Sequence, residues 1–207
     1  MGRVKLHIGC GNRTLPGYIN VDIQDFPGVD RVDNARTLHS FKDEEGDEIY
    51  CSHLLNHFNR SSILDVLSCW NQVLKPGGRI RIAVPDFEAI CKVYAKDGLS
   101  ELEGLLCGGQ RHELDHHTMQ FDFALLQSFL EAAGFGDVCR YDWQGFLPMG
   151  FDDCSMAYIP HMNEEHGTLM SLNVTAVKKR APMTGRLPLD LRKAQGEWRG
   201  YDDSQSS

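Results

Sequence analysis

The sequence predicts a single α/β domain built on a mostly parallel sheet with helices on both faces. Segments with the two-residue alternation of strands are interleaved along the chain with segments of helical apolar spacing. The first strand runs directly into Gly9 and Gly11, and a second short apolar run ends in Asp22. The chain has 207 residues and a hydrophobic fraction of 42%, which suits one domain with one core.

The N-terminal stretch predicts a nucleoside-containing cofactor. Apolar residues alternate with Lys5 and His7 over residues 4–8, as in a strand. Glycines at positions 9 and 11 let the backbone turn sharply and let a ligand approach the main chain. An acid at the tip of the second strand, here Asp22, can accept hydrogen bonds from both hydroxyls of a ribose.

The glycine spacing narrows the choice of cofactor. Dinucleotide-binding folds use G-x-G-x-x-G, whose third glycine allows a helix to pack close while its N-terminus receives the pyrophosphate. Thr14 stands at that third position, so only the G-x-G of Gly9, Cys10 and Gly11 is present. A short G-x-G suits a nucleoside ligand without phosphates.

The middle of the chain continues the alternation. Short strands are expected over residues 30–34 and 48–52. A helix is expected to begin at Ser62, because Asp65 completes a capping pattern and an apolar stripe follows at helical spacing. The stripe consists of Ile63, Leu67, Trp70 and Leu74. Residues 75–78, Lys-Pro-Gly-Gly, should end this helix, and residues 79–85 read as the next strand.

The second half adds two helices and two strands. Helices are expected over residues 87–95 and 123–133, the second ended by Gly134, and strands over 138–143 and 171–178. A glycine-containing segment spans residues 98–117. Residues 1–180 therefore form the predicted domain, and residues 181–207, with two prolines and many polar residues, are predicted to be a weakly packed or disordered tail.

Candidate binding residues fall together at the ends of the predicted strands. In open α/β sheets, ligands bind at the carboxyl ends of the strands. Gly9 to Gly11, Asp22, Asn34, Ser52 with His53, and Pro85 with Asp86 all occupy such ends. Their convergence on one edge of the sheet is stronger evidence for a site than any single motif.

From residue 4 to about residue 178, the chain resembles a group of small predicted methyltransferases within the class I S-adenosylmethionine-dependent family. The resemblance rests on Leu6-His-Ile-Gly-Cys-Gly-Asn12, Leu15-Pro-Gly-Tyr-Ile-Asn-Val-Asp22, Ile49-Tyr-Cys-Ser-His-Leu-Leu-Asn-His-Phe58, Leu74-Lys-Pro-Gly-Gly-Arg-Ile-Arg-Ile82, Val84-Pro-Asp86, Gly108-Gly-Gln-Arg111 and Asp152-Asp-Cys-Ser155.

This resemblance implies a Rossmann-like fold, with a seven-stranded sheet whose last strand is antiparallel. It implies S-adenosyl-L-methionine as the cofactor and methyl transfer to an unidentified small-molecule or saccharide-type acceptor. The residues expected to bind the cofactor are Gly9, Cys10, Gly11, Asp22, Ile23, Asn34, Ala35, Ser52 and His53.

The chain departs from the family pattern at three places. Asn34 stands where the family usually has an acid at the end of the third strand, although an amide oxygen can still accept a hydrogen bond from the adenine amino group. Asn56 replaces an acid before His57, which leaves open a non-catalytic binding protein of the same fold. Only ten residues separate Gly11 from Asp22, so the first crossover must be a loop or a single turn.

A further alternative is a zinc hydrolase. His112-Glu-Leu-Asp-His116 matches the H-E-x-x-H zinc signature, which needs both histidines on one helix face together with a third ligand. Gly108 and Gly109 immediately precede it and are poor helix formers. We therefore expect no metal site.

Residues 110–117 are the predicted acceptor side of the site. Seven of these eight residues are polar, and they follow the strand ends that hold the cofactor. A histidine with a pKa near neutral can take a proton from an oxygen or nitrogen acceptor. His117 and His116 are therefore the candidate catalytic residues, and Tyr158 and His161 belong to a second polar segment that could close the same site.

Composition limits the other partners. A net charge of −8 disfavours a nucleic-acid polymer as substrate. No apolar run approaches the ~18 residues of a membrane span. The seven cysteines are scattered and form no C-x-x-C, which favours reduced thiols and a cytoplasmic protein. The oligomeric state has no signature in the sequence.

Overall fold

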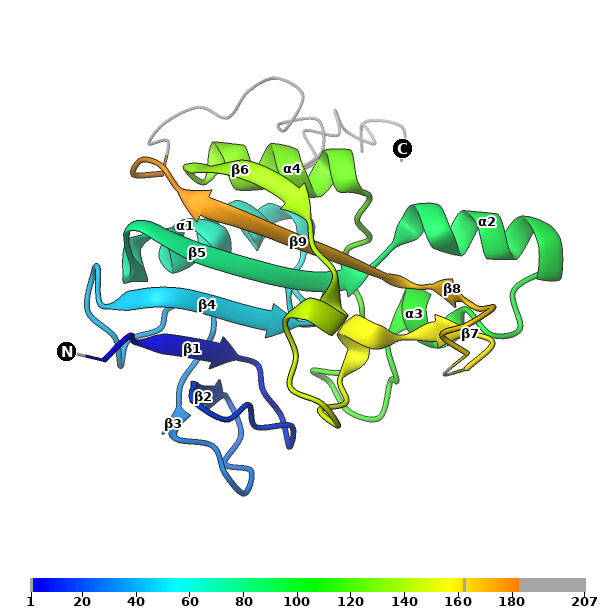
Figure 1. The fold of residues 1–207 in the computed structure, drawn as a ribbon, viewed down its shortest axis with the longest axis horizontal. Helices are drawn as coiled ribbons and strands as arrows, with labels where there is room; N and C mark the ends of the chain where they lie inside the picture. Colours follow the sequence, from blue (N-terminus) through cyan, green and yellow to red (C-terminus); the bar gives the residue numbers. More distant parts are fainter. Residues whose placement is uncertain (1, 162, 183–207) are drawn as a thin grey trace, which may run out of the picture.

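A seven-stranded sheet forms the centre of the protein in the computed structural model, which describes residues 2–161 and 163–182 (Figure 1). The strand order is β3-β2-β1-β4-β5-β9-β6. Its strands are β1 (Lys5–Ile8), β2 (Ile19–Asp22), β3 (Arg31–Val32), β4 (Gly46–Ser52), β5 (Leu74–Pro85), β6 (Phe135–Arg140) and β9 (Ser171–Lys178). β9 runs antiparallel to β5 and β6, and the other neighbouring strands are parallel. The predicted sheet and its antiparallel last strand are confirmed.

The helix expected after Ser62 is α1 (Ile63–Val73), which follows the short 3₁₀ turns η1 (Leu55–His57) and η2 (Arg60–Ser62). Its apolar side is buried, and Trp70 also donates a hydrogen bond of 2.7 Å from its indole N–H to the Ala35 carbonyl. The helix ends one residue earlier than the stripe suggests. Leu74 has an extended backbone and opens β5, because its buried side chain belongs to the sheet.

The later helices start at acidic N-caps. Asp86 accepts hydrogen bonds from the N–H groups of Glu88 and Ala89 at the start of α2 (Phe87–Asp97), and Asp122 caps α4 (Phe123–Ala132). A short helix, α3 (Glu103–Cys107), lies in the glycine-containing segment and was not predicted.

The strand predicted over residues 138–143 is displaced. β6 begins directly after Gly134, whose positive φ of 90° ends α4. It stops at Arg140, and residues 143–145 form the 3₁₀ turn η3 (Trp143–Gly145). The apolar alternation of residues 138–143 therefore does not mark a strand over its full length.

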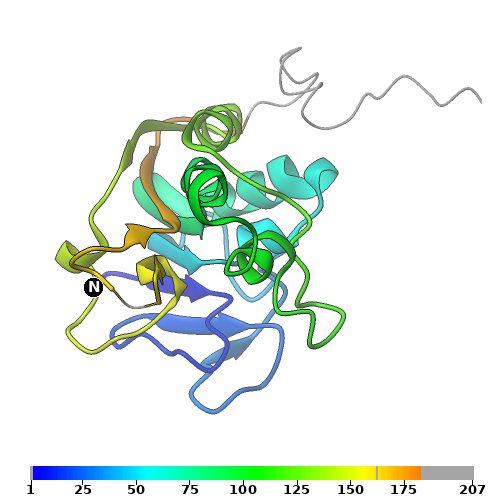
Figure 2. The ribbon, with the colours of Figure 1, turned by 90° about the vertical axis from the view of Figure 1, so that its right-hand side faces the viewer.

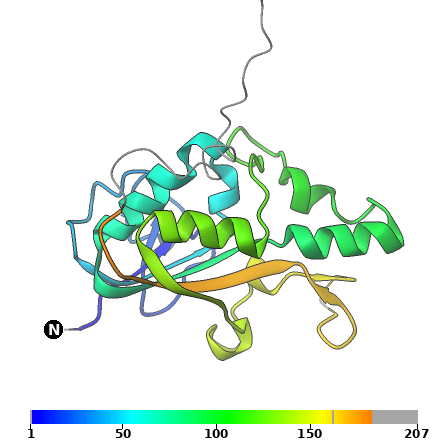
Figure 3. The same cartoon turned by 90° about the horizontal axis from the view of Figure 1, so that it is seen from above.

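The α-helices of the described residues lie on one face of the sheet, which corrects the prediction of helices on both faces. Figure 3 shows α1, α2, α3 and α4 above the sheet, and Figure 2 shows them gathered on the same side. The connections from β1 to β2, β2 to β3 and β3 to β4 contain loops and turns without a helix. Helices on the second face would have to come from these connections, so the described residues place no α-helix there.

The core between the helices and the sheet is apolar. Alternate residues of β4 and β5, such as Ile49, Cys51, Ile80 and Ile82, are fully buried there with residues of α1 and α4. This cluster supplies the main hydrophobic driving force for folding.

The opposite face of the sheet is covered by the chain that follows β6. This cover contains η3, η4 (Cys154–Met156) and the hairpin of β7 (Tyr158–Ile159) and β8 (Thr168–Leu169). Tyr50 of β4 is buried here among Trp143, Leu147 and Met156, and its hydroxyl donates a hydrogen bond to the Asp153 carboxylate. This second core is smaller and more polar than the first.

Two further findings concern the limits of the domain. Within the described residues, no helix has both the length and the apolar character required to span a membrane. The predicted tail at residues 181–207 lies outside the described residues, apart from residues 181 and 182.

Candidate cofactor and acceptor site

The turn after β1 and the acid after β2 are joined directly. Gly9 and Gly11 have φ values of 68° and 54°, the left-handed region that glycine adopts without strain. The N–H of Gly11 donates to one carboxylate oxygen of Asp22 at 2.8 Å, and the N–H of Gln24 donates to the other at 2.9 Å. Asp22 is thus held in place beside the turn and remains partly exposed.

The two glycines serve different purposes. A Cβ at Gly9 would lie 2.7 Å from a methyl carbon of Leu54, whereas a Cβ at Gly11 would meet no atom within 4 Å. Open space therefore lies over Gly11, next to a fixed and partly exposed carboxylate. Ile23, 49% exposed, provides an apolar surface after the same strand. This combination fits a ligand with a hydroxyl-bearing sugar and a flat apolar base.

Cys10 lies between the glycines and is buried. Burial, reinforced by the charge of Asp22, raises the pKa of its thiol to about 12. The thiol is therefore protonated and unreactive at neutral pH. Its position leaves the main chain of the turn, rather than the sulfur, available to a ligand.

The end of the third strand carries an acid that the sequence reasoning missed. β3 stops at Val32, and Asp33 follows directly. Its carboxylate accepts from the Ser40 N–H at 2.7 Å and from the Ser40 hydroxyl, and it also accepts from the Asn34 N–H. Burial raises the pKa of Asp33, but these hydrogen bonds outweigh it and leave the pKa below its ordinary value. Asp33 therefore shapes the turn.

Asn34 and Ala35 come after this turn. Asn34 is exposed, and its side-chain oxygen already accepts one hydrogen bond from the Arg36 N–H at 2.9 Å. An amide oxygen has a second lone pair, so it can still accept from a ligand. The carbonyl of Ala35 is used by Trp70. Both residues lie at the same sheet edge as Asp22, because Asp22 and Val32 are partners in the sheet.

Ser52 and His53 end β4 beside this group. The Ser52 hydroxyl oxygen is buried and has no hydrogen-bond partner among the described residues. The ring nitrogen Nε2 of His53 lies 3.2 Å from the Ser171 hydroxyl at the start of β9. Burial, reinforced by the neighbouring His117 and His57, lowers the pKa of His53 to about 3. His53 is neutral at physiological pH.

The polar segment of residues 108–117 is a compact turn built around one buried carboxylate. Asp115, 9% exposed, accepts hydrogen bonds from the backbone N–H groups of Gly109 and Arg111 and from the Arg111 side chain at 2.7 Å. The Arg111 hydrogen bond is the main reason that the pKa of Asp115 falls to about 2. Gly108 is required because a Cβ there would lie 2.6 Å from the Asp115 carbonyl oxygen.

This turn presents His117 and His116 differently. The Nδ1 of His117 lies 2.8 Å from the Leu105 carbonyl, which can only accept, so Nδ1 carries the proton and Nε2 keeps a free lone pair. The His117 ring packs edge-on against His57, with centroids 4.9 Å apart. His116 is exposed, and no side-chain hydrogen bond holds it within the described residues. Of the two histidines, only His117 is held by a side-chain hydrogen bond among the described residues.

The departure from the family pattern at Asn56 is structural. Asn56 is completely buried, and neither atom of its amide has a hydrogen-bond partner among the described residues. Its backbone carbonyl accepts from the N–H groups of Thr118 and Met119, which attaches the segment after His117 to η1. Asn56 therefore does not present its side chain to a ligand.

A segment from the second half of the chain reaches the glycine turn. Arg13, after the turn, lies 3.5 Å from Asp152. The likeness of residues 152–155 to a family motif signalled this segment, but not its contact with Arg13.

The zinc signature does not lie on a helix. Residues 111–114 make a bend and a turn, so His112 and His116 do not share a helix face. In the described part of the chain, no three histidine, cysteine, aspartate or glutamate side chains are grouped as metal ligands. The absence of zinc from the protein stays a prediction.

Comparisons with known proteins agree with this architecture. Residues 15–82 match the family model described as a methyltransferase domain. A SAM-dependent methyltransferase from Archaeoglobus fulgidus is 19% identical, with a TM-score of 0.52 over 85% of this chain and 86% of that chain. A SAM-dependent methyltransferase structure from Methanosarcina mazei is 17% identical, with a TM-score of 0.51 over 86% of this chain and 92% of that one. Among curated proteins, none matches the sequence.

The fold is that of the SAM-dependent methyltransferases to which the chain is structurally similar, and residues 15–82 match a methyltransferase domain. A methyltransferase of this kind uses S-adenosyl-L-methionine as methyl donor. Such an enzyme requires a methyl acceptor, which the matches do not identify.

Proposed function

We propose that this protein methylates an oxygen or nitrogen atom of a small-molecule or saccharide-type acceptor, with His117 as the general base. The observation that carries the proposal is the fixed tautomer of His117, whose Nδ1 is committed to the Leu105 carbonyl and whose Nε2 is free to accept a proton. The net charge of −8 argues against a nucleic-acid polymer as acceptor.

The residues at the strand ends are well suited to hold the cofactor. Asp22 would accept hydrogen bonds from the ribose hydroxyls, and Ile23 would contact the adenine. The glycine turn with Cys10 would leave room for the ligand beside the main chain, and Asn34 with Ala35 would lie at the adenine edge. Ser52 and His53 would border the methionine side of the cofactor.

S-adenosyl-L-methionine supplies a methyl group carried on a positively charged sulfur. Methyl transfer forms a bond between the acceptor atom and the methyl carbon and breaks the carbon–sulfur bond, whose electron pair stays on sulfur. The proton of the acceptor atom goes to Nε2 of His117. The main task of the protein is to align the acceptor, and the Asp115 turn holds His117 for that purpose.

The alternatives are less well supported. Asn56 suggests a non-catalytic binding protein of the same fold. Asn56 is completely buried, however, so its identity does not alter His117 or Asp22, the residues proposed here as base and ribose acceptor. A zinc hydrolase would need a helix at residues 112–116, where the chain turns. The free state of all seven cysteines supports a reducing compartment, and we propose a cytoplasmic location on that basis.

The His117→Asn variant tests the proposal. The asparagine amide nitrogen can keep the hydrogen bond to Leu105, while the basic Nε2 is lost. With labelled S-adenosyl-L-methionine and fractionated metabolites as acceptors, product formation should fall by about 10²–10⁴-fold. The cofactor affinity measured by calorimetry should be unchanged.

His116→Ala is the matched control, because His116 is adjacent but exposed and unattached. It should retain the activity of the unaltered protein. Equal rates for His117→Asn and the unaltered protein would remove His117 from the mechanism. A protein that binds the cofactor but methylates nothing would favour the non-catalytic alternative.

A further inference from the structure

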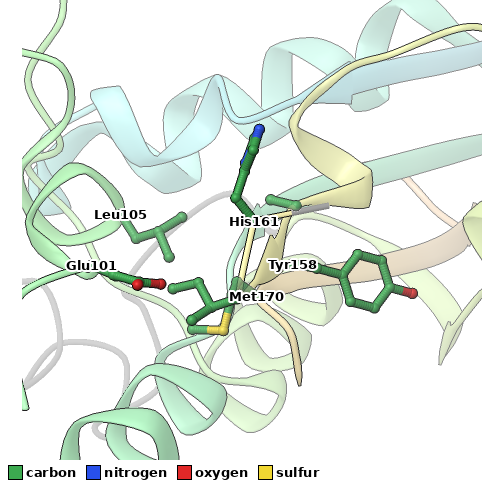
Figure 4. A pocket seen from close by; sticks show the side chains of 7 residues that line it. Glu101, Leu105, Tyr158, His161 and Met170 are labelled. Atoms are coloured by element: carbon green, nitrogen blue, oxygen red, sulfur yellow. The ribbon is translucent and has the colours of Figure 1, made fainter. Parts of the chain in front are cut away.

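A pocket of about 330 Å³ lies between α3 and the β7–β8 hairpin (Figure 4). Most of its wall is apolar, formed by Leu105, Ala157, Ile159 and Met170. Its size is at the lower end of the range for small-molecule sites. In Figure 4, Glu101 and Leu105 project into this space from the α3 side, next to Met170.

Two contacts connect the pocket to His117 and His53. Leu105 lines the pocket with its side chain and accepts the hydrogen bond from His117 with its carbonyl. Met170 lines the pocket and immediately precedes Ser171, whose hydroxyl contacts His53. The wall of the pocket is therefore joined to both histidines through Leu105 and through the start of β9.

The polar part of the lining favours a positive ligand. Glu101 is the acidic residue of the lining, His161 and Tyr158 complete it, and the wall contains no lysine or arginine. Within the described residues, no cation lies within ion-pair distance of Glu101.

We infer that this pocket binds the apolar body of the methyl acceptor and that the acceptor is a small organic amine whose ammonium group pairs with Glu101. This inference rests on the proposed methyltransferase function and names the class of its acceptor. An apolar wall gains from burying a hydrocarbon or aromatic body, while an unpaired carboxylate at the rim selects a cation and repels an acid.

Three probes of the same shape test the charge preference. The intact protein is titrated at neutral pH with 2-phenylethylamine, 2-phenylethanol and phenylacetate, without cofactor, and binding is followed by calorimetry or ligand-observed NMR. The amine should bind up to about fivefold more tightly than the alcohol, since Glu101 is exposed and an exposed ion pair adds only modest affinity. The acid should bind most weakly.

Three variants locate the effect. Glu101→Gln should reduce amine affinity to that of the alcohol, whereas Glu103→Gln, with the same change in charge outside the lining, should not. Ala157→Leu should narrow the pocket and weaken both ligands, and its thermal unfolding checks that it folds. Equal binding by all three probes, absence of amine binding, or an unaltered preference in Glu101→Gln would overturn the inference.

The same variants separate this inference from the proposed function. Glu101→Gln should raise the KM for an amine acceptor while the KM for S-adenosyl-L-methionine stays constant, and His117→Asn should lower kcat. An acceptor methylated equally well by the unaltered protein, Glu101→Gln and Ala157→Leu would refute the pocket assignment and leave the methyltransferase function standing. Selective amine binding without any methylation would refute the function and support the ligand class.

Discussion

At the scale of single residues, the site depends on contacts that fix side chains before any ligand binds. The Asp22 carboxylate is held by two backbone N–H groups, and His117 is held by one carbonyl. Both were candidates from the sequence, because a strand–glycine–acid pattern and a polar histidine segment are local features. Two other contacts of the site, Leu54 over Gly9 and Leu105 beside His117, could not be predicted. These leucines are distant in the sequence or belong to no distinctive pattern.

Removal of the Asp22 carboxylate should weaken cofactor binding. In Asp22→Ala the ribose hydroxyls lose a charged acceptor and the Gly11 N–H loses its partner. Calorimetry should show that binding of S-adenosyl-L-methionine is weaker by about 1.5–3 kcal/mol. Asp25→Asn, an exposed neighbour, is the control, and an unchanged affinity in Asp22→Ala would contradict the ribose assignment.

The buried histidines should make stability depend on pH. His53 has a pKa of about 3 in the folded protein, below its unfolded value, and burial also lowers the pKa of His57. At pH values between the folded pKa of His53, about 3, and its unfolded pKa, about 6.5, the unfolded chain binds a proton on this histidine that the folded chain does not. Stability is therefore fully present above about pH 6.5, the ordinary histidine pKa, and falls as the pH decreases.

Urea unfolding at pH 7 and pH 5 measures this effect. His53 should account for a loss of up to about 2 kcal/mol over that interval. In His53→Gln, which can still bond to Ser171 but cannot titrate, the loss should be smaller by that amount. The same pH dependence in both proteins would mean that other groups cause it.

At the scale of elements, sequence patterns located the strands and helices whose apolar spacing is strong. β1, α1, α2, α4 and β9 lie close to their predicted bounds. The misplaced start of β6 and the missed α3 have a common cause. β6 follows Gly134, and α3 lies in a glycine-containing segment. The backbone geometry of such chain is set by tertiary contacts, such as that between Gly134 and residues 180–181.

Gly108 is the element-scale test of the acceptor side. It has a φ of 79°, and a Cβ would contact the Asp115 carbonyl and the His117 N–H at 2.6 and 3.0 Å. Gly108→Ala should therefore displace His117 and reduce product formation, while the cofactor affinity stays constant. It should also lower the free energy of unfolding by about 1 kcal/mol or more.

Gly104→Ala is the matched control for this substitution. Gly104 lies in α3, where a Cβ would meet no atom within 4 Å. The alanine should leave activity unchanged and stabilise the helix by up to about 1 kcal/mol. If both alanine variants kept full activity, the turn would not position a catalytic group.

At the scale of the whole molecule, the sheet has one face covered by helices and one covered by loops (Figure 3). The short connection between Gly11 and Asp22 predicted a loop at the first crossover. The described residues place no α-helix on that face because the connections from β2 to β3 and from β3 to β4 also lack one. The loop-covered face combines the smaller apolar core around Tyr50 with an ion pair between two strands of the sheet. Arg81 contacts Glu48 at 2.7 Å and lies over the Phe146 ring at 4.4 Å.

This pair should behave as a buried ion pair. The side chains of Arg81 and Glu48 are 18% and 12% exposed, so each charge depends on the other. Glu48→Met leaves the guanidinium without its partner and should lower the free energy of unfolding by about 3 kcal/mol. Arg81→Met should have a similar cost, because it leaves the carboxylate unpaired.

The double variant Glu48→Met/Arg81→Met decides between a structural and an incidental role for the pair. It removes both charges together, and methionine at position 81 can still pack against Phe146, so its loss should be smaller than the sum of the two single losses. Urea unfolding of the four proteins gives the coupling energy. A coupling near zero would mean that the two charges do not stabilise each other and that the pair is incidental. A coupling of about 1 kcal/mol or more would show that the ion pair stabilises the contact between β4 and β5 on this face of the sheet.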